Sequence, residues 1–146
     1  MEAADFTISI TVDQSPSEVF SAINNVRGWW QGEITGSTDK LNDEFGYQME
    51  DMHFSKQKVT ELVPNKRVAW LVTESNLSFT KKTGEWTGTR ILFEIVELDG
   101  KTQLRFTHQG LTTEFECYDA CSGGWTGLIR KSLFGLITAG KGQKVF

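Results

Sequence analysis

The chain has 146 residues, and its 15 Lys and Arg against 19 Asp and Glu give a formal net charge of −4 at pH 7. This length suits one hydrophobic core, so we expect residues 1–146 to form a single domain. The acidic balance and the lack of a basic run argue against a nucleic-acid partner, and no apolar run approaches the ~18 residues of a membrane span.

The first part of the chain predicts a strand and two short helices. Apolar residues alternate with Ser and Thr over residues 6–12, which indicates a strand with one buried face. Residues 15–18 read Ser-Pro-Ser-Glu, which is typical of a helix N-terminus. Residues 26–31 predict a second short helix or turn that carries Trp29 and Trp30. Two adjacent rings cannot share one helix face, so we expect one to be buried and the other to lie at an opening.

The middle of the chain predicts about six antiparallel strands. Alternating apolar residues or β-formers mark segments 33–35, 45–49, 53–62, 68–72, 89–98 and 103–109. Asp99-Gly100 predicts a two-residue hairpin turn, and Lys81-Lys82-Thr83-Gly84 predicts another hairpin tip.

The last long segment, Cys117 to Ala139, predicts an amphipathic helix of about six turns. At about 100° per residue, one apolar stripe forms; it contains Tyr118, Cys121, Trp125, Leu128, Ile129, Ser132, Leu133 and Leu136. Gly140 follows as a predicted C-cap. Glycines lie inside the helix at 123, 124, 127 and 135. Either the helix bends or breaks at Gly123-Gly124, or these small residues leave room beneath it.

This element order predicts an α+β fold. Long antiparallel strands with one apolar face need a cover, and only the C-terminal helix is large enough to supply it. We therefore expect a curved antiparallel sheet of six or seven strands wrapped on that helix, with two short helices after the first strand. A curved sheet and a straight helix do not fit tightly everywhere, so a pocket is expected between them.

The candidate ligand-binding residues are mostly aromatic, in a chain that is 12% aromatic. They are Trp29, Trp30, Phe45, Tyr47, Trp70, Phe93, Phe106, His108, Trp125, Ile129 and Leu133. Each ring either fills the core or contacts a flat or apolar ligand. His108 should point inward, either as a hydrogen-bonded core residue or as a ligand contact or acid–base catalyst. His53 lies in a more polar strand and is expected at the surface.

The two cysteines, Cys117 and Cys121, lie four residues apart on one side of the last helix. Zinc would need two further ligands nearby, and only His108 is close in sequence, so we expect no metal site and no cofactor. The start of the chain lacks a positive region followed by an apolar segment, so no signal peptide is expected. Free cysteines in such a chain indicate a reducing, cytoplasmic setting.

Several segments together resemble the START-like, helix-grip (SRPBCC) superfamily, and most closely its branch named after the activator of the heat-shock-protein-90 ATPase. The matching segments are Ser15-Pro16-Ser17-Glu18-Val19-Phe20, Trp29-Trp30, Val59-Thr60-Glu61-Leu62-Val63-Pro64, Glu85-Trp86-Thr87-Gly88-Thr89, Phe106-Thr107-His108-Gln109-Gly110-Leu111 and the helix with Gly124-Trp125. The resemblance implies a cavity between sheet and helix that takes an apolar small molecule. It does not fix the function, because this fold serves many functions.

Three functions are therefore expected in order. The first is binding of a hydrophobic or aromatic ligand in the internal cavity, without chemistry. The second, by family analogy, is a chaperone-interacting module; it ranks lower because the family's activators carry a further N-terminal domain that we do not expect here. The third is a cyclase-like or hydrolase-like enzyme that uses His108. Phe134, opposite the apolar stripe with Gly123 and Gly127 near it, could make a homodimer contact.

Overall fold

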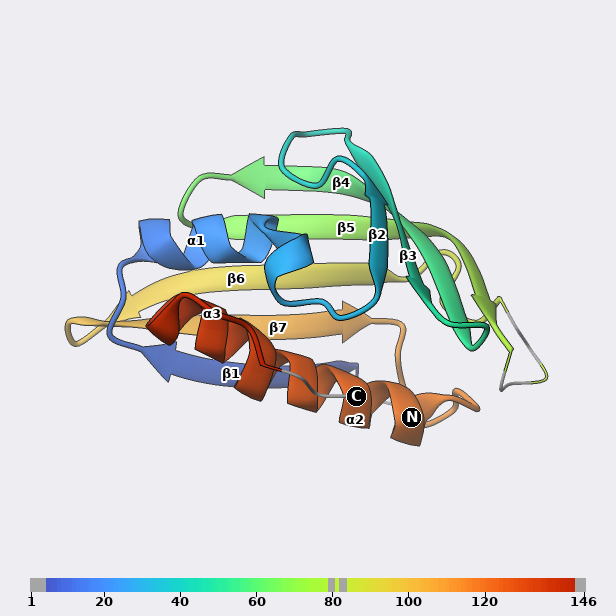
Figure 1. Cartoon of the computed structure of the whole chain (residues 1–146). Helices are drawn as coiled ribbons and strands as arrows, with labels where there is room; N and C mark the ends of the chain where they lie inside the picture. Colours follow the sequence, from blue (N-terminus) through green and yellow to red (C-terminus); the bar gives the residue numbers. More distant parts are fainter. Residues whose placement is uncertain (1–4, 79–80, 82–83, 144–146) are drawn as a thin grey trace.

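A computed structural model describes residues 5–78, 81 and 84–143 of the chain (Figure 1). Within these residues the elements are β1 (Phe6–Val12), α1 (Pro16–Asn24), the 3₁₀ helix η1 (Val26–Gly28), β2 (Glu33–Gly36), β3 (Glu44–Met49), β4 (His53–Val63), β5 (Arg67–Leu77), β6 (Arg90–Leu98), β7 (Lys101–Gln109), α2 (Tyr118–Gly127), the π-helical segment η2 (Leu128–Leu133) and α3 (Phe134–Ala139). The expected α+β helix-grip architecture is confirmed. Two of the four residues of the predicted hairpin tip at 81–84 lie outside the described residues.

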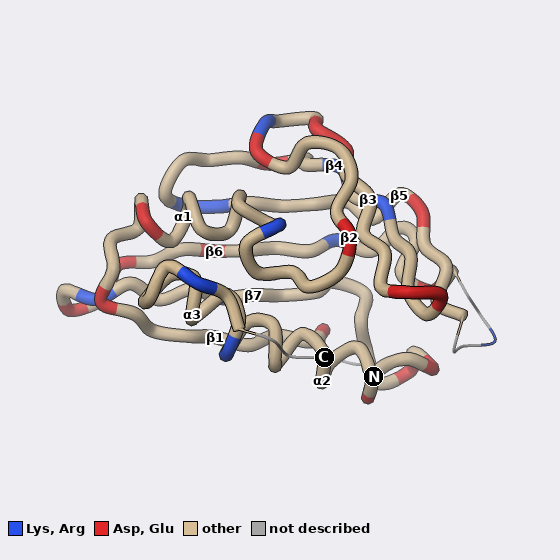
Figure 2. The backbone as a smooth tube through the Cα atoms, in the orientation of Figure 1, with Lys and Arg blue, Asp and Glu red and all other residues tan. Residues whose placement is uncertain are grey.

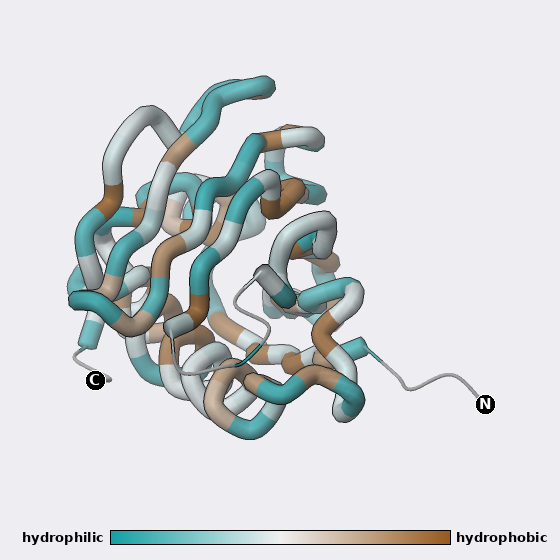
Figure 3. Tube along the Cα trace, turned by 90° about the vertical axis from the view of Figure 1, so that its right-hand side faces the viewer, coloured by the Kyte–Doolittle hydropathy of each residue, from teal (hydrophilic) through white to brown (hydrophobic). Residues whose placement is uncertain are grey.

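The described strands form one antiparallel sheet in the order β1-β7-β6-β5-β4-β3-β2. Buried and more exposed side chains alternate along β1 and β7, whereas the central strands β5 and β6 each carry three consecutive buried residues. Figure 3 shows hydrophobic and hydrophilic residues alternating along neighbouring strands. The β4–β5 pairing shifts register between Lys56 and Gln57 and again between Val59 and Glu61. Such bulges bend and twist a strand pair, which lets the sheet curl around its contents.

Two local sequence signals are confirmed at element ends. The Ser15 hydroxyl accepts the Glu18 N–H at 3.2 Å, and Pro16 is the first residue of α1. Between β6 and β7, Asp99 and Gly100 adopt φ angles of 52° and 78°. Positive φ at both central residues is the requirement of a type I′ turn, whose twist matches that of the flanking strands.

The C-terminal helical segment and α1 lie on the same face of the sheet and cover its apolar side (Figure 1). The helical segment runs without interruption from Tyr118 to Ala139, so of the two alternatives for its glycines, a break at Gly123-Gly124 is wrong. The irregularity lies instead in η2, where the backbone takes the wider π spacing. Gly140 ends the helix with a φ of 76°, as its predicted role as C-cap requires.

The π segment changes which side chains face the sheet. A π turn contains an extra residue, so the inward face of the helix rotates after it. Ile137, which a uniform 100° turn places off the stripe, is 8% exposed, whereas Leu136 is only partly buried. Phe134 is 37% exposed, as expected for the outer side. Among the described residues, no helix is both long and apolar enough to cross a membrane.

Candidate functional site

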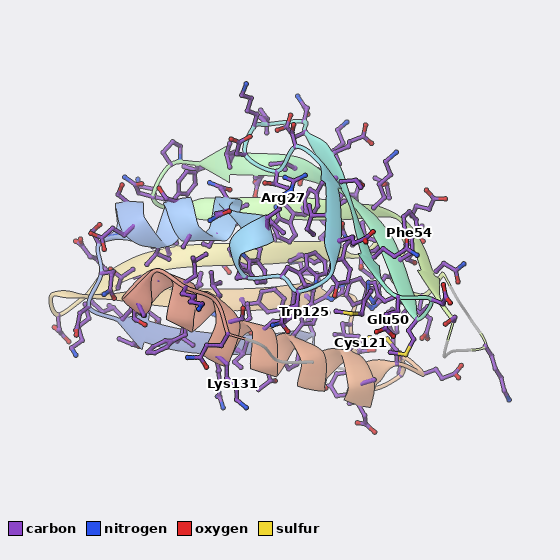
Figure 4. The ribbon with its side chains drawn as sticks, viewed as in Figure 1. Arg27, Glu50, Phe54, Cys121, Trp125 and Lys131 are labelled. Atoms are coloured by element: carbon purple, nitrogen blue, oxygen red, sulfur yellow. The ribbon has the colours of Figure 1, made fainter. Side chains whose placement is uncertain are left out.

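A pocket of about 330 Å³ opens where the β3–β4 turn, the segment before β6 and the helix α2 meet. Its wall contains Trp30, Tyr47, Met49, Glu50, Met52, His53, Trp86, Ala120, Cys121, Gly124, Trp125 and Leu128. Figure 4 shows Trp125, Cys121 and Glu50 gathered at this end of the molecule. The wall is mostly aromatic, sulfur-containing or aliphatic, which is the composition of a site for an apolar ligand.

Five rings of the wall form a closed circuit of contacts. Their successive centroid distances are 4.0 Å for Trp30–Tyr47, 5.0 Å for Tyr47–His53, 4.5 Å for His53–Trp86, 5.7 Å for Trp86–Trp125 and 5.1 Å for Trp125–Trp30. Four of these distances lie within the usual range of favourable ring–ring contacts, and the stacked pair Trp30–Tyr47 is closer still. We call this set the aromatic ring circuit. Because each ring supports the next, the wall is organised before any ligand arrives.

Three of the eleven predicted ligand-binding residues line the pocket: Trp30, Tyr47 and Trp125. The other eight, which are Trp29, Phe45, Trp70, Phe93, Phe106, His108, Ile129 and Leu133, are buried in the core behind it. Ligand contact by any of the eleven stays a prediction. The structure thus divides the eleven residues into three that line the pocket and eight that pack behind it.

The tryptophan pair at 29 and 30 shows how the core and the pocket join. Trp29 packs in the core and Trp30 lines the opening, as expected, although both rings are buried. The rings stack at a centroid distance of 6.2 Å because η1 ends here and the chain leaves helical geometry. Trp29 accepts a hydrogen bond at its carbonyl from Ser132 at 2.6 Å, which ties this pair to the C-terminal helix.

His108 is held by hydrogen bonds at both ring nitrogens. The Trp125 indole N–H donates to Nδ1 at 3.1 Å, so the proton of the neutral imidazole sits on Nε2. Nε2 lies 2.8 Å from the Thr89 hydroxyl, which in turn donates to the Trp86 carbonyl at 2.5 Å. Burial, and then the charge of His53, lowers the pKa of His108 to about 3. His108 therefore orients Trp125, and neither nitrogen is left free to exchange a proton with a ligand.

His53 lies in the pocket wall, and the expectation that it lies at the surface is wrong. It is the first residue of β4 and points to the same side as Ser55 and Gln57, which are fully buried. Its Nε2 lies 3.1 Å from the Ser55 hydroxyl, which also accepts from the Gln57 amide at 2.5 Å. Burial lowers the pKa of His53 to about 4. Because Ser55 and Gln57 on the inward face of β4 are polar, the sequence shows no apolar alternation that would identify this face.

Tyr47 and Trp86 are two further residues of the pocket wall. The Tyr47 hydroxyl donates to the Gln31 carbonyl, and burial raises the pKa of Tyr47, so the phenol is neutral. Trp86 was missed as a pocket residue, although it lies in one of the segments that carry the family resemblance. Its position in an irregular stretch before β6 gives no strand or helix period that would predict its direction.

Of the two cysteines, Cys121 lines the pocket, and Cys117 is buried. A hydrogen bond between the two sulfurs lowers the pKa of Cys117, and the same contact together with burial raises the pKa of Cys121. The Glu85 carboxylate accepts from the backbone N–H groups of Glu116 and Cys117 at 3.0 and 3.3 Å, at the start of α2. No group of three or more His, Cys, Asp or Glu within the described residues is placed to hold a metal ion.

A second, more open hollow of about 600 Å³ lies between α1, η1 and the segment after β2. Its wall contains Phe20, Ser21, Asn24, Asn25, Arg27, Gly36, Ser37, Thr38 and Asp39. The Arg27 guanidinium donates to the carbonyls of Ile34 and Gly36 at 3.2 and 2.8 Å, so it braces the chain (Figure 4). With one aromatic residue in its wall, this hollow offers little apolar surface to a ligand.

The family model described as Activator of Hsp90 ATPase homolog 1-like protein matches residues 13–136 of the chain. Among curated proteins, none matches the sequence significantly.

Several solved structures have the same fold and match almost the whole length of this chain. The solution structure of the Aha1 dimer from Colwellia psychrerythraea is similar with a TM-score of 0.75 and 24% identity, over 95% of this chain and 99% of that one. DynU16, from the dynemicin biosynthetic locus, has a TM-score of 0.69 and 14% identity, over 97% of this chain and 49% of that one. CalU16 from Micromonospora echinospora has a TM-score of 0.64 and 17% identity, over 94% and 78%. At these identities the likeness concerns the fold alone.

Proposed function

The chain belongs to the family of Activator of Hsp90 ATPase homolog 1-like proteins, and within this fold we propose that it binds a small apolar molecule in the pocket of Trp30, Trp86 and Trp125. The observation that carries the proposal is an opening of about 330 Å³ whose wall is a closed circuit of five rings. Large rings usually interlock to fill a core, and here they border a space instead.

The expected affinity follows from the size of the opening. Apolar surface removed from water contributes about 25 cal/mol per Å², so covering 150 Å² of a one-ring ligand contributes about 4 kcal/mol before the cost of association. A probe of that size should therefore bind with a dissociation constant of roughly 1 mM or weaker. The natural ligand would be larger or would make polar contacts as well.

Gly124 offers a direct test, because it lines the pocket from within α2 while its neighbour Gly123 faces open space. A leucine at either position gains helix propensity, so Gly123→Leu is a matched control for Gly124→Leu. We expect neopentylbenzene to quench or shift the tryptophan fluorescence saturably in the native protein and in Gly123→Leu. In Gly124→Leu the affinity should fall at least about tenfold, because the new side chain fills the space.

Two results would contradict ligand binding in this pocket. One is the absence of any saturable response in the native protein. The other is equal affinity in Gly124→Leu and Gly123→Leu while both variants keep the circular dichroism spectrum of the native protein. The spectrum is needed because a misfolded variant would lose binding for an unrelated reason.

The enzyme alternative is weakened by the hydrogen bonds of His108. Its two ring nitrogens are engaged by Trp125 and Thr89, and its imidazole would need to break one of these bonds to transfer a proton. The buried free thiols of Cys117 and Cys121 support the cytoplasmic setting that we propose.

Contact with a chaperone and formation of a homodimer stay proposals. The first rests on the family's name, and the second on the exposed Phe134 and on the dimer of the Colwellia psychrerythraea protein. Co-precipitation with an Hsp90-class chaperone tests the first. Light scattering of the native protein and of Phe134→Asp tests the second, and a monomeric mass for the native protein would exclude it.

A further inference from the structure

The charge of the pocket wall is one-sided. Of the lining residues within the described part of the chain, only Glu50 carries a formal charge at neutral pH, and it is negative. His53 is held neutral by burial, which lowers its pKa to about 4, and the Tyr47 phenol is neutral as well. Among the residues that the structure describes, no lysine or arginine lines this pocket, although acidic and basic residues are interspersed along the chain (Figure 2). An anionic head group would therefore meet a carboxylate and no cation.

The Glu50 carboxylate is available to a ligand. Glu50 is exposed at the turn between β3 and β4, at the mouth of the pocket near Trp125 and Cys121 (Figure 4). No ion pair among the described residues uses its side chain. The described hydrogen bond at this residue engages only its backbone carbonyl, which accepts from the Gln48 amide at 3.0 Å.

The aromatic ring circuit supplies the second half of a cation site. The face of an aromatic ring carries partial negative charge and attracts an ammonium group within about 6 Å of the centroid. Tryptophan is the strongest of these rings, and the circuit contains Trp30, Trp86 and Trp125. The rings are also buried, which strengthens the attraction by keeping water away.

We propose that the pocket selects organic cations, namely a quaternary or tertiary ammonium group on an apolar body, with the apolar part against the rings and the charge shared between the ring circuit and Glu50. This inference rests on the proposed function, since it specifies the ligand class of the same pocket. Because Glu50 and the ring faces are negative, fatty acids and phosphate esters are not the preferred ligands.

Three matched probes test the inference: benzyltrimethylammonium, its uncharged carbon analogue neopentylbenzene, and phenylmethanesulfonate. They share one ring and nearly one shape, and differ in the sign of the charge. We expect the cation to bind at least about fivefold tighter than the sulfonate, as followed by tryptophan fluorescence and calorimetry. Equal affinity of the two ions, or tighter binding of the sulfonate, would overturn the inference.

The neutral probe separates this inference from the proposed function. If neopentylbenzene binds and the cation does not, the pocket binds ligands but does not select cations. If none of the three probes binds, the proposed function fails and the inference fails with it.

Glu50→Gln locates the selectivity, and Asp51→Asn is its matched control. Both variants remove one negative charge from the same turn, but only Glu50 lines the pocket. We expect the ratio of the cation and sulfonate affinities to fall about threefold in Glu50→Gln and to stay near the native value in Asp51→Asn. An equal fall in both variants would show a diffuse surface effect and would refute the role of Glu50. Because Glu50 is exposed, this comparison does not depend on a variant that might fail to fold.

Discussion

At the scale of single residues, two side chains and one backbone carbonyl fix the direction of the protons around His108. An indole N–H can only donate, so Trp125 makes Nδ1 the acceptor and leaves the proton on Nε2. The Thr89 hydroxyl can then accept from Nε2 only because its own proton goes to the Trp86 carbonyl. The chain of bonds links the backbone carbonyl of Trp86 to the ring of Trp125 through Thr89 and His108.

Replacing Thr89 with valine should show how much these hydrogen bonds contribute to the free energy of unfolding. Valine keeps the shape of threonine but leaves the His108 Nε2–H buried without an acceptor, which costs about 1–3 kcal/mol of unfolding free energy. Thr89→Ser keeps the hydroxyl and should lose less. Urea unfolding measures both. A serine variant as unstable as the valine variant would mean that the methyl group, rather than the hydroxyl, is what matters at this position.

The candidate site could be predicted from the sequence only where strand or helix periodicity gives a direction. Tyr47 and Trp125 lie in regular elements, and their inward direction could be predicted. Trp86 lies in an irregular stretch, and His53 begins a strand whose inward side continues with Ser55 and Gln57. Polar residues on a buried face erase the alternation on which such predictions depend. Hydrogen bonding between neighbouring inward side chains, which makes these residues tolerable inside, is invisible in a single sequence.

At the scale of elements, the π segment η2 decides which residues of the last helix are buried. Four of its six residues are buried, so the wider turn faces the core. Its extra residue moves the inward face toward Ile137 and away from Leu136.

This rotation predicts an unequal cost for two neighbouring truncations. Ile137→Ala removes a buried side chain and should cost about 2–4 kcal/mol, whereas Leu136→Ala at the partly exposed position should cost roughly half as much. Urea denaturation of both variants is the measurement. A helix with a uniform turn of 100° predicts the reverse order, and a larger loss for Leu136→Ala would contradict the π segment.

Element boundaries with local chemical causes were predictable, whereas those with distant causes were not. The N-cap at Ser15 and the turn at Asp99-Gly100 depend on a few neighbouring residues, and the sequence is sufficient to find them. The bulges of β4 and the π turn depend on how these elements pack against distant parts of the chain. Gly123 and Gly124 suggested a bend or break at their own position, but the continuous helix tolerates them and its irregularity lies in η2.

At the scale of the whole molecule, the interior carries polar groups that water would stabilise. The Gln57 Oε1, Trp70 Nε1 and Trp86 Nε1 atoms are buried without a hydrogen-bond partner among the described residues. Each such group costs free energy, and one of the three, Trp86, lies in the pocket wall. The two buried imidazoles belong to the same interior, since each must stay neutral for the fold to keep its contacts.

Acid should therefore unfold the protein through its histidines. In the folded state burial holds the pKa of His53 at about 4 and that of His108 at about 3, against 6.5 in an unfolded chain. The unfolded state thus binds more protons below pH 6.5, so stability is full above that value and is lost as the pH falls toward 4. Each histidine contributes up to about 1.4 kcal/mol per pH unit in this window.

His53→Phe isolates one of the two contributions, because phenylalanine keeps a ring between Tyr47 and Trp86 but cannot be protonated. Urea unfolding across the window should show a shallower loss of stability in this variant than in the native protein, by up to about 1.4 kcal/mol per pH unit. Carboxylates common to both proteins cancel in this difference. Parallel curves would mean that His53 is solvated well enough to take up its proton in the folded state, and that the pocket is wetter than its rings imply.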